Sequence, residues 1–352
     1  MKIGIDIRMI NHSGIGTYIN NLVPLIIKKN PKVKFYLIYN KKNIVEWKKL
    51  YSNTVFVLFN SKIYSLSEQF EFYKINKYSL KLFWSPHYNF PIMANTKVIV
   101  TVHDILHLVD KDLSIFKKMY SSFMFFLLKR KASKIIADSQ FTKSEIINYL
   151  KVENDLVDVI YLGIDKFFEK KHQNSDGNFL LYVGNIKKHK NLKTLLKAFN
   201  LLNDTNFRLY IVGEYQSLRS PDNEVLDLIA KNDNILLKGR VDNEKLREYY
   251  SNAQALIFPS LYEGFGLPPL EAMACGCPVI ASDKASIPEI CSDAVLYFKP
   301  IDVNGLVKQI NTLLSDDKLK NKLIKSGYIQ SEKYSWDNSA DKIIYLIRDI
   351  IE

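Results

Sequence analysis

YEGFGLPPLEAMACG, the stretch from Tyr262 to Gly276, sets two carboxylates, Glu263 and Glu271, eight positions apart. Two glycines and two prolines lie between them. These residues argue against one continuous helix, because proline is tolerated in the first helical turn and disrupts a helix interior. We therefore expect Glu263 on a turn and Glu271 in the first turn of the helix that follows.

This turn is a predicted anion site. The backbone N–H groups from Gly264 to Leu267 converge at the start of the expected helix, where the helix dipole favours negative charge. Amides of this kind beside two carboxylates suit a phosphorylated, hydroxyl-rich ligand such as a sugar nucleotide. An unusual turn before a core helix, without a ligand, is the alternative interpretation.

Composition and length indicate an ordinary globular protein. The chain has 352 residues, which favours two domains, and its hydrophobic content of 47% is typical. The first expected strand begins at Lys2 and leaves no room for a signal peptide. The apolar run Phe123 to Leu128 is too short to span a bilayer. Cys275, Cys277 and Cys291 are interpreted as free thiols of a cytoplasmic protein, with small core residues favoured over a metal or redox role.

The positive charge is confined to one half of the chain. The formal net charge is +12, and residues 1–168 carry all of the excess. Nucleic acid and an anionic membrane surface are both partners for such a half. The segment from Ser114 to Lys134 mixes bulky apolar residues with lysines, as an interfacial helix does, and so favours the membrane. A lysine-rich solvated surface is the third interpretation.

Apolar, β-branched runs alternate with helical ones, which predicts parallel sheets covered on both faces. The expected strands are 2–8, 34–39, 97–104 and 134–139, then 178–184, 207–213, 234–239, 255–260 and 277–282, and expected helices include 17–29, 114–132 and 337–352. The polar stretch 169–178 is a predicted linker between two domains.

The segment from Asn11 to Tyr18 is a candidate phosphate-binding loop. It follows a strand, contains Gly14 and Gly16, and precedes a helix. It lacks the third glycine and the acidic residue of a dinucleotide fingerprint. A tight turn with no ligand fits it equally well.

His103 and Asp104 end another expected strand. Ligands of parallel sheets bind at the carboxyl ends of strands, and a His–Asp pair can orient a sugar hydroxyl or move a proton. A structural histidine is the competing interpretation.

Three lysines, Lys187, Lys188 and Lys190, crowd the start of a helix expected near Asn191. Cations there are unfavourable unless an anion lies between them and the helix amides. This favours a phosphate site, with Lys190 closest to the helix. The acidic pair in the triplet 110–112 could hold a divalent cation, but it precedes a helix and is better explained by capping. With lysines present, no metal is required.

Together, GIGTY, VHD, VGNIKKHKNL and EGFGLPPLEAMACGCPVIAS followed by SIPE resemble the retaining glycosyltransferases of family GT4, over residues 3–300. The resemblance implies the GT-B fold, an α/β architecture in which two Rossmann-like, doubly wound parallel-sheet domains face each other across a cleft. Residues 1–168 would form the acceptor-binding domain, with helix 336–352 packed back on it. Residues 169–335 would bind the nucleotide sugar.

The resemblance also implies roles for individual residues. Gly14 and Gly16 would lie against the donor diphosphate. His103 would reach the transferred sugar, Asp104 would shape the acceptor side, and Lys190 would neutralise the diphosphate and stabilise the leaving group.

In the second domain, Glu263 would bind sugar hydroxyls beside the amides of Phe265, Gly266 and Leu267. Glu271 would hold the ribose hydroxyls, and the backbone of Val241 would touch the nucleobase. Many relatives have an arginine or threonine at the place of Asn185 and an arginine at His189. Asn185 is kept as a donor contact, and Lys187 or Lys188 would supply the second phosphate cation.

The predicted function is retaining hexosyl transfer by a front-face mechanism, without a metal. The donor would be a nucleotide sugar, with GDP-mannose as the first candidate, and the acceptor a glycan or polyprenyl-linked glycan of lipopolysaccharide or capsule. The protein would be cytoplasmic, associate peripherally with the inner face of the bacterial plasma membrane, and bind no nucleic acid. The alternatives are a GT-B-fold sugar-nucleotide epimerase, which needs no separate acceptor, and a non-catalytic glycan- or membrane-binding protein.

Overall fold

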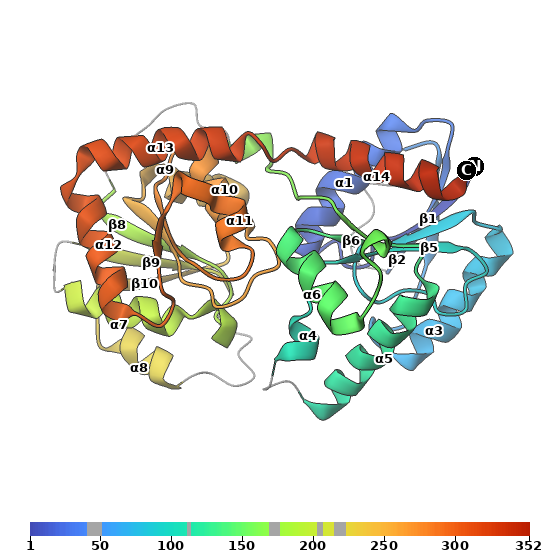
Figure 1. Cartoon of the computed structure of the whole chain (residues 1–352), viewed down its shortest axis with the longest axis horizontal. Helices are drawn as coiled ribbons and strands as arrows, with labels where there is room; N and C mark the ends of the chain where they lie inside the picture. Colours follow the sequence, from blue (N-terminus) through green and yellow to red (C-terminus); the bar gives the residue numbers. More distant parts are fainter. Residues whose placement is uncertain (41–50, 111–113, 169–176, 203–206, 215–222) are drawn as a thin grey trace. The chain divides into compact units, whose positions relative to one another are not determined.

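The computed structural model describes residues 1–40, 51–110, 114–168, 177–202, 207–214 and 223–352 (Figure 1). The chain divides into two compact units. The first comprises Met1–Gly163 together with Trp336–Glu352, and the second is Ile164–Ser335. Residues 169–176 of the predicted linker and residues 111–112 of the acidic triplet lie outside the described residues.

The first unit is built on a seven-stranded parallel sheet of order β3-β2-β1-β4-β5-β6-β7. Its strands are β1 (Lys2–Asp6), β2 (Lys34–Tyr39), β3 (Thr54–Leu58), β4 (Leu82–Ser85), β5 (Lys97–Val102), β6 (Lys134–Ala137) and β7 (Val157–Val159). Its helices are α1 (Ile15–Lys29), α3 (Leu66–Phe72), η1 (Tyr73–Tyr78), α4 (Leu106–Val109), α5 (Ile115–Lys131), α6 (Gln140–Leu150), η2 (Asn154–Leu156) and α14 (Trp336–Ile351). The central strands are apolar almost throughout because helices cover the sheet on both faces.

The last helix belongs to the first unit although it follows the second in sequence. In Figure 1, α14 lies beside α1, and the two helices pack together. The Lys29 ammonium pairs with the Asp341 carboxylate at 2.7 Å, and the Ser339 hydroxyl donates to the Tyr161 carbonyl at 2.6 Å. The buried side chains of α14, which include Ile343 and Ile347, complete the core of this unit.

The second unit contains a six-stranded parallel sheet of order β10-β9-β8-β11-β12-β13. Its strands are β8 (Phe179–Val183), β9 (Arg208–Val212), β10 (Ile235–Gly239), β11 (Ala255–Phe258), β12 (Val279–Ser282) and β13 (Leu296–Phe298). Its helices are η3 (Lys166–Phe168), η4 (Lys188–Lys190), α7 (Leu192–Leu202), α8 (Asn223–Ala230), α9 (Asn243–Asn252), α10 (Leu267–Ala274), α11 (Ile287–Cys291), η5 (Ser292–Ala294), α12 (Val303–Ser315) and α13 (Asp317–Ser331). One face of the sheet packs on α7, α8 and α12 in a large apolar core.

Every predicted strand is present, and each ends at or before its predicted boundary. Four strands, β3, β4, β7 and β13, were not predicted. Length explains only β7 and β13, which contain three residues each and show no apolar periodicity, because β3 and β4 are no shorter than strands that were predicted. The overall prediction of two parallel α/β sheets is confirmed.

Two further observations bear on the sequence predictions. No helix among the described residues is both long enough and apolar enough to cross a bilayer. Cys275, Cys277 and Cys291 are buried, and none of the three takes part in a disulfide among the described residues.

Candidate active site

Glycines line the carboxyl edge of the sheet in the second unit. Gly184 follows β8, Gly213 follows β9, and Gly239 ends β10. The Gly213 amide donates to the Gly239 carbonyl at 2.9 Å. A Cβ atom on Gly213 would lie 2.1 Å from the Gly184 carbonyl oxygen, so no side chain fits there. This edge therefore presents bare backbone where parallel sheets receive ligands.

Lys190 ends the short helix η4 beside this edge. Asn191, which follows it, adopts a left-handed conformation with φ 54°. The Asn191 side-chain amide donates to the carbonyls of Pro259 at 3.0 Å and Pro300 at 2.7 Å. These bonds tie Lys190 to the segments that follow β11 and β13. The position of the lysine is thus fixed by tertiary contacts.

The Lys190 ammonium contacts both carboxylate oxygens of Glu263, at 2.7 and 2.9 Å. The two side chains are only 21% and 12% exposed. The structure thus joins the predicted leaving-group cation and the predicted sugar-binding carboxylate in one largely buried ion pair. The fold itself holds the two charges next to each other.

Hydrogen bonds from the N-cap residue of α11 hold the turn that carries Glu263. The Ser286 hydroxyl lies 2.9 Å from the Glu263 carbonyl oxygen and 2.8 Å from that of Phe265. Gly266 has φ 105° and is the N-cap of α10, without a side chain to bond the first-turn amides. Leu267 begins the helix. The predicted glycine turn at a helix start is therefore present.

Glu271 is the fifth residue of α10, one position beyond the first turn in which we expected it. The expectation was wrong because the helix already begins at Leu267, before the two prolines. One Glu271 carboxylate oxygen accepts a 3.0 Å hydrogen bond from the Tyr250 hydroxyl on α9. Burial, with a smaller contribution from Asp165, raises the pKa of Glu271 to about 7. Tyr250 was not predicted, because nothing local marks a partner contributed by another helix.

Asn185, Val241, Lys187 and Lys188 are the remaining residues that we predicted to contact the donor. The Asn185 side-chain oxygen accepts from the Glu214 amide at 3.2 Å, so this residue braces the segment after β9. Val241 follows β10 and is half-buried, whereas Lys187 and Lys188 are exposed. Their contact with a donor stays a prediction.

The glycine loop of the first unit has a backbone explanation. Gly14 has φ 55° at the N-cap of α1. A Cβ atom on Gly16 would lie 2.6 Å from the Ile10 carbonyl oxygen. Both positions therefore require glycine for the turn itself, and their predicted contact with a diphosphate stays a prediction.

The partner of His103 is Asp138, not the neighbouring Asp104. His103 Nδ1 lies 2.5 Å from an Asp138 carboxylate oxygen, and Nε2 lies 2.9 Å from the Pro86 carbonyl oxygen. Because β5 and β6 pair in register, Val102 opposite Ala137, the residues that follow them lie side by side. The Asp104 carboxylate instead accepts from the Leu106 amide at 2.8 Å, at the first residue of α4.

The partners of His103 also constrain its proton. A carbonyl oxygen only accepts, so Nε2 must carry hydrogen. The Asp138 carboxylate at Nδ1 favours a second proton on the ring and outweighs the effect of burial, so the pKa of His103 is raised. A signal for Asp138 existed in the sequence, because it lies near the carboxyl end of the expected strand 134–139.

Within the described residues, no three His, Cys, Asp or Glu side chains gather as a metal site. What the second unit offers instead is a largely buried lysine paired with a carboxylate, and a helix start without a side-chain cap, in the segments that follow β8 and β11. Such a set is suited to hold a diphosphate and hydroxyl groups.

These features define the class of protein, and sequence comparison agrees. Residues 163–330 match the family model for glycosyl transferases group 1, and residues 53–166 match that for glycosyltransferase family 4. The chain belongs to this family and is a glycosyltransferase of the GT-B fold, in a family of retaining enzymes. Family membership favours a transferase over the epimerase and non-catalytic hypotheses.

Particular relatives narrow the comparison. The chain is 32% identical over 266 residues to the O-antigen chain mannosyltransferase RfbU of Salmonella typhimurium, covering 75% of this chain and 72% of that protein. It is 31% identical over 229 residues to O-antigen chain mannosyltransferase B of Escherichia coli, covering 60% of each. Anabaena Alr3699/HepE, solved with UDP and glucose, superimposes with a TM-score of 0.81 at 16% identity, covering 99% of this chain and 100% of that one.

Replacing Asp138 tests the histidine pair. In Asp138→Asn the anionic partner of Nδ1 is lost, so the pKa of His103 should fall and the imidazole should titrate at lower pH. NMR titration of the imidazole signals measures this. Asp104→Asn is the matched control, because that carboxylate bonds a backbone amide, and it should move the titration less. Equal titration in wild type and Asp138→Asn would contradict the assignment.

Glu271 makes stability depend on pH. Its pKa is about 7 in the folded chain and near 4.5 without burial, so folding favours its protonated form. This contribution is fully present below pH 4.5 and is lost as pH rises through 7. From pH 5 to 8, wild type should therefore lose up to about 2–3 kcal/mol of unfolding free energy relative to Glu271→Gln. Urea unfolding of both proteins across this range measures it, and a constant difference would contradict the raised pKa.

Proposed function

We propose that this protein transfers mannose from GDP-mannose, with retention of configuration, to a lipid-linked glycan that becomes part of a bacterial surface polysaccharide. The observation that carries the proposal is the Lys190–Glu263 ion pair at the glycine edge of the second unit, beside the start of α10. The names of the two mannosyltransferase relatives support the choice of sugar and of acceptor class.

The ion pair suggests how the donor would be received. A bound diphosphate competes with Glu263 for the Lys190 ammonium, while the sugar hydroxyls donate to the Glu263 carboxylate. The buried pair thereby exchanges one internal contact for two contacts with the ligand. Because both side chains are held by Asn191 and Ser286 through their neighbouring backbone, little reorganisation is required.

In the proposed reaction, the bond between the anomeric carbon and the diphosphate oxygen breaks, and its electron pair stays on that oxygen. Lys190 and the amides at the start of α10 stabilise the growing negative charge. The acceptor hydroxyl oxygen attacks the anomeric carbon from the same face. Its proton passes to the leaving phosphate oxygen, so no protein nucleophile and no metal are required.

The acceptor would be presented at a membrane surface, for which α5 is the proposed contact. Five apolar side chains of this helix are exposed: Ile115 (74%), Phe116 (87%), Met119 (65%), Phe123 (51%) and Phe126 (48%). Lys117, Lys118, Lys129, Arg130 and Lys131 lie on the same helix. Apolar side chains that enter the lipid boundary between cations that attract anionic headgroups are typical of an interfacial helix. An anionic bilayer is therefore the proposed occupant of this face.

Two substitutions test the transfer site. Lys190→Met removes the cation at nearly constant size, and Glu263→Gln removes the carboxylate charge. Each should lower the rate of mannosyl transfer from GDP-mannose by roughly two orders of magnitude or more, as loss of transition-state stabilisers does. Transfer to a lipid-linked acceptor extract, followed with radiolabelled donor, measures this. Lys308→Met serves as the control, because Lys308 is an exposed lysine on α12 of the same unit, and two variants with near-wild-type rates would refute the site.

Liposome flotation tests the membrane contact. Phe116→Glu should reduce capture by vesicles that contain anionic lipid about tenfold, since it places a negative charge at the most exposed apolar position of α5. Ile301→Glu is the matched control, because Ile301 is 84% exposed but lies in the second unit. Added salt should weaken wild-type capture. Equal capture by neutral and anionic vesicles would exclude the electrostatic part of the proposal.

A further inference from the structure

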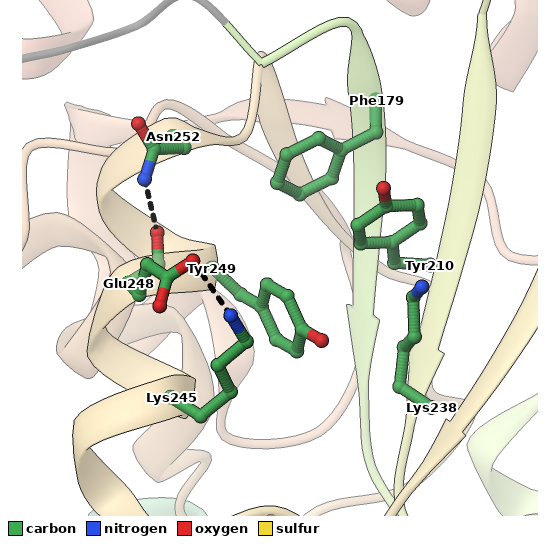
Figure 2. Close-up of a pocket in the computed structure, with 7 residues that line it drawn as sticks. All are labelled: Phe179, Tyr210, Lys238, Lys245, Glu248, Tyr249 and Asn252. Atoms are coloured by element: carbon green, nitrogen blue, oxygen red, sulfur yellow. Dashed lines mark hydrogen bonds and ion pairs between the residues drawn. The ribbon is translucent and has the colours of Figure 1, made fainter.

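A cavity of about 290 Å³ lies in the second unit between α9 and the sheet (Figure 2). Four lining residues come from α9, and three come from β8, β9 and β10. Phe179, the first residue of β8, lines it, whereas the glycine edge lies beyond the last residue of that strand. None of the lining residues belongs to the predicted donor site.

The wall of this cavity is aromatic. The rings of Phe179 and Tyr210 stack with centroids 4.2 Å apart and an interplanar angle of 15°. Tyr249 stands edge-on to both, with centroids 6.3 and 5.5 Å away. Figure 2 shows Tyr249 projecting from α9 toward the two strand residues. Ring surfaces of this kind pack against the apolar C–H face of a sugar.

The cavity carries one positive charge that its own residues do not balance. Lys245 pairs with Glu248 at 2.7 Å. Lys238 lies with its ammonium 4.1 Å from the centroid of the Tyr210 ring, and it takes part in no ion pair found within the described parts of the chain. A half-buried ammonium in this position favours an anionic group on the ligand.

Polar acceptors complete the lining. The Asn252 side-chain amide donates to the Glu248 carbonyl at 2.8 Å, and Figure 2 shows its oxygen on the side away from the three rings. The Glu248 carboxylate is suited to accept from hydroxyl groups. The volume lies at the lower end of the range for ligand pockets, about 300–1,000 Å³, which suits a single sugar unit better than a whole nucleotide sugar.

We propose that this cavity binds one hexose unit that bears a carboxylate or a phosphate, separately from the donor edge. Lys238 would pair with the acidic group, Tyr249 would pack against the sugar ring, and the Glu248 carboxylate would accept from a hydroxyl. The link to glycan synthesis rests on the proposed function, since a transferase of surface polysaccharide would meet such units in its acceptor or product. Binding itself does not depend on that function.

Ligand-detected NMR on the full chain tests the site with D-glucuronate, mannose 6-phosphate, neutral mannose and inorganic phosphate. One or both acidic sugars should bind more tightly than mannose and than phosphate alone, and the pattern distinguishes carboxylate from phosphate. Lys238→Met should weaken that binding about tenfold or more, as loss of a charged hydrogen bond does. Lys238→Arg should restore most of it. Lys231→Met, on an exposed lysine outside the cavity, should leave it unchanged.

Three results would overturn the proposal: no binding of either acidic sugar, equal binding of neutral mannose, or equal binding by Lys238→Met. Phosphate that binds as tightly as mannose 6-phosphate, without glucuronate binding, would also overturn it, because the sugar would then contribute nothing. A chain that binds an acidic sugar but transfers no mannose would count against the proposed transfer reaction and leave this site standing.

Discussion

The Lys190–Glu263 ion pair joins the segment after β8 to the segment after β11 at the carboxyl edge of the sheet in the second unit. Withdrawing two charges from water costs several kcal/mol per ion unless geometry and further hydrogen bonds offset it. Here the ammonium contacts both carboxylate oxygens, and each residue is anchored through backbone neighbours by Asn191 and Ser286. Hydrophobic residues of similar volume would pack at lower cost. A ligand that uses both charges would account for an ion pair that is retained in spite of this desolvation penalty.

Glycines keep the sheet edge in the second unit free of side chains at the ends of β8, β9 and β10. Gly213 approaches the Gly184 carbonyl so closely that any side chain at this position is excluded. No side chain of residue 213 therefore projects from this edge of the sheet. On α10, the positive φ of Gly266 turns the chain without a capping side chain. Glycine backbone at the ends of β8, β9 and β10, the start of α10 and the Lys190–Glu263 pair therefore all lie at or after the carboxyl ends of strands of one sheet.

A feature could be predicted from the sequence when it is determined by residues that are neighbours in the chain. The strands before Gly184 and Gly213 were visible because each is a continuous apolar run that ends in glycine. The turn at Gly266 was visible because glycine and proline constrain the backbone within a few residues. Strand β13 was missed because three residues carry no periodicity. Its place in the sheet comes from pairing with β12, which is a tertiary effect.

The partner of a side chain was harder to predict from the sequence, because it depends on tertiary contacts. Asp104 is adjacent to His103 in sequence, but successive residues after a strand point in different directions, and the register of β5 with β6 brings Asp138 to the ring instead. Tyr250 reaches Glu271 from another helix in the same way. The sequence thus identified which residues carry charge at the strand ends, while their pairing depended on strand order. Because pairing also determines where protons reside, His103 with both ring nitrogens engaged is better suited to orient and to carry positive charge than to accept a proton from an acceptor hydroxyl. This agrees with a reaction in which the leaving phosphate accepts that proton.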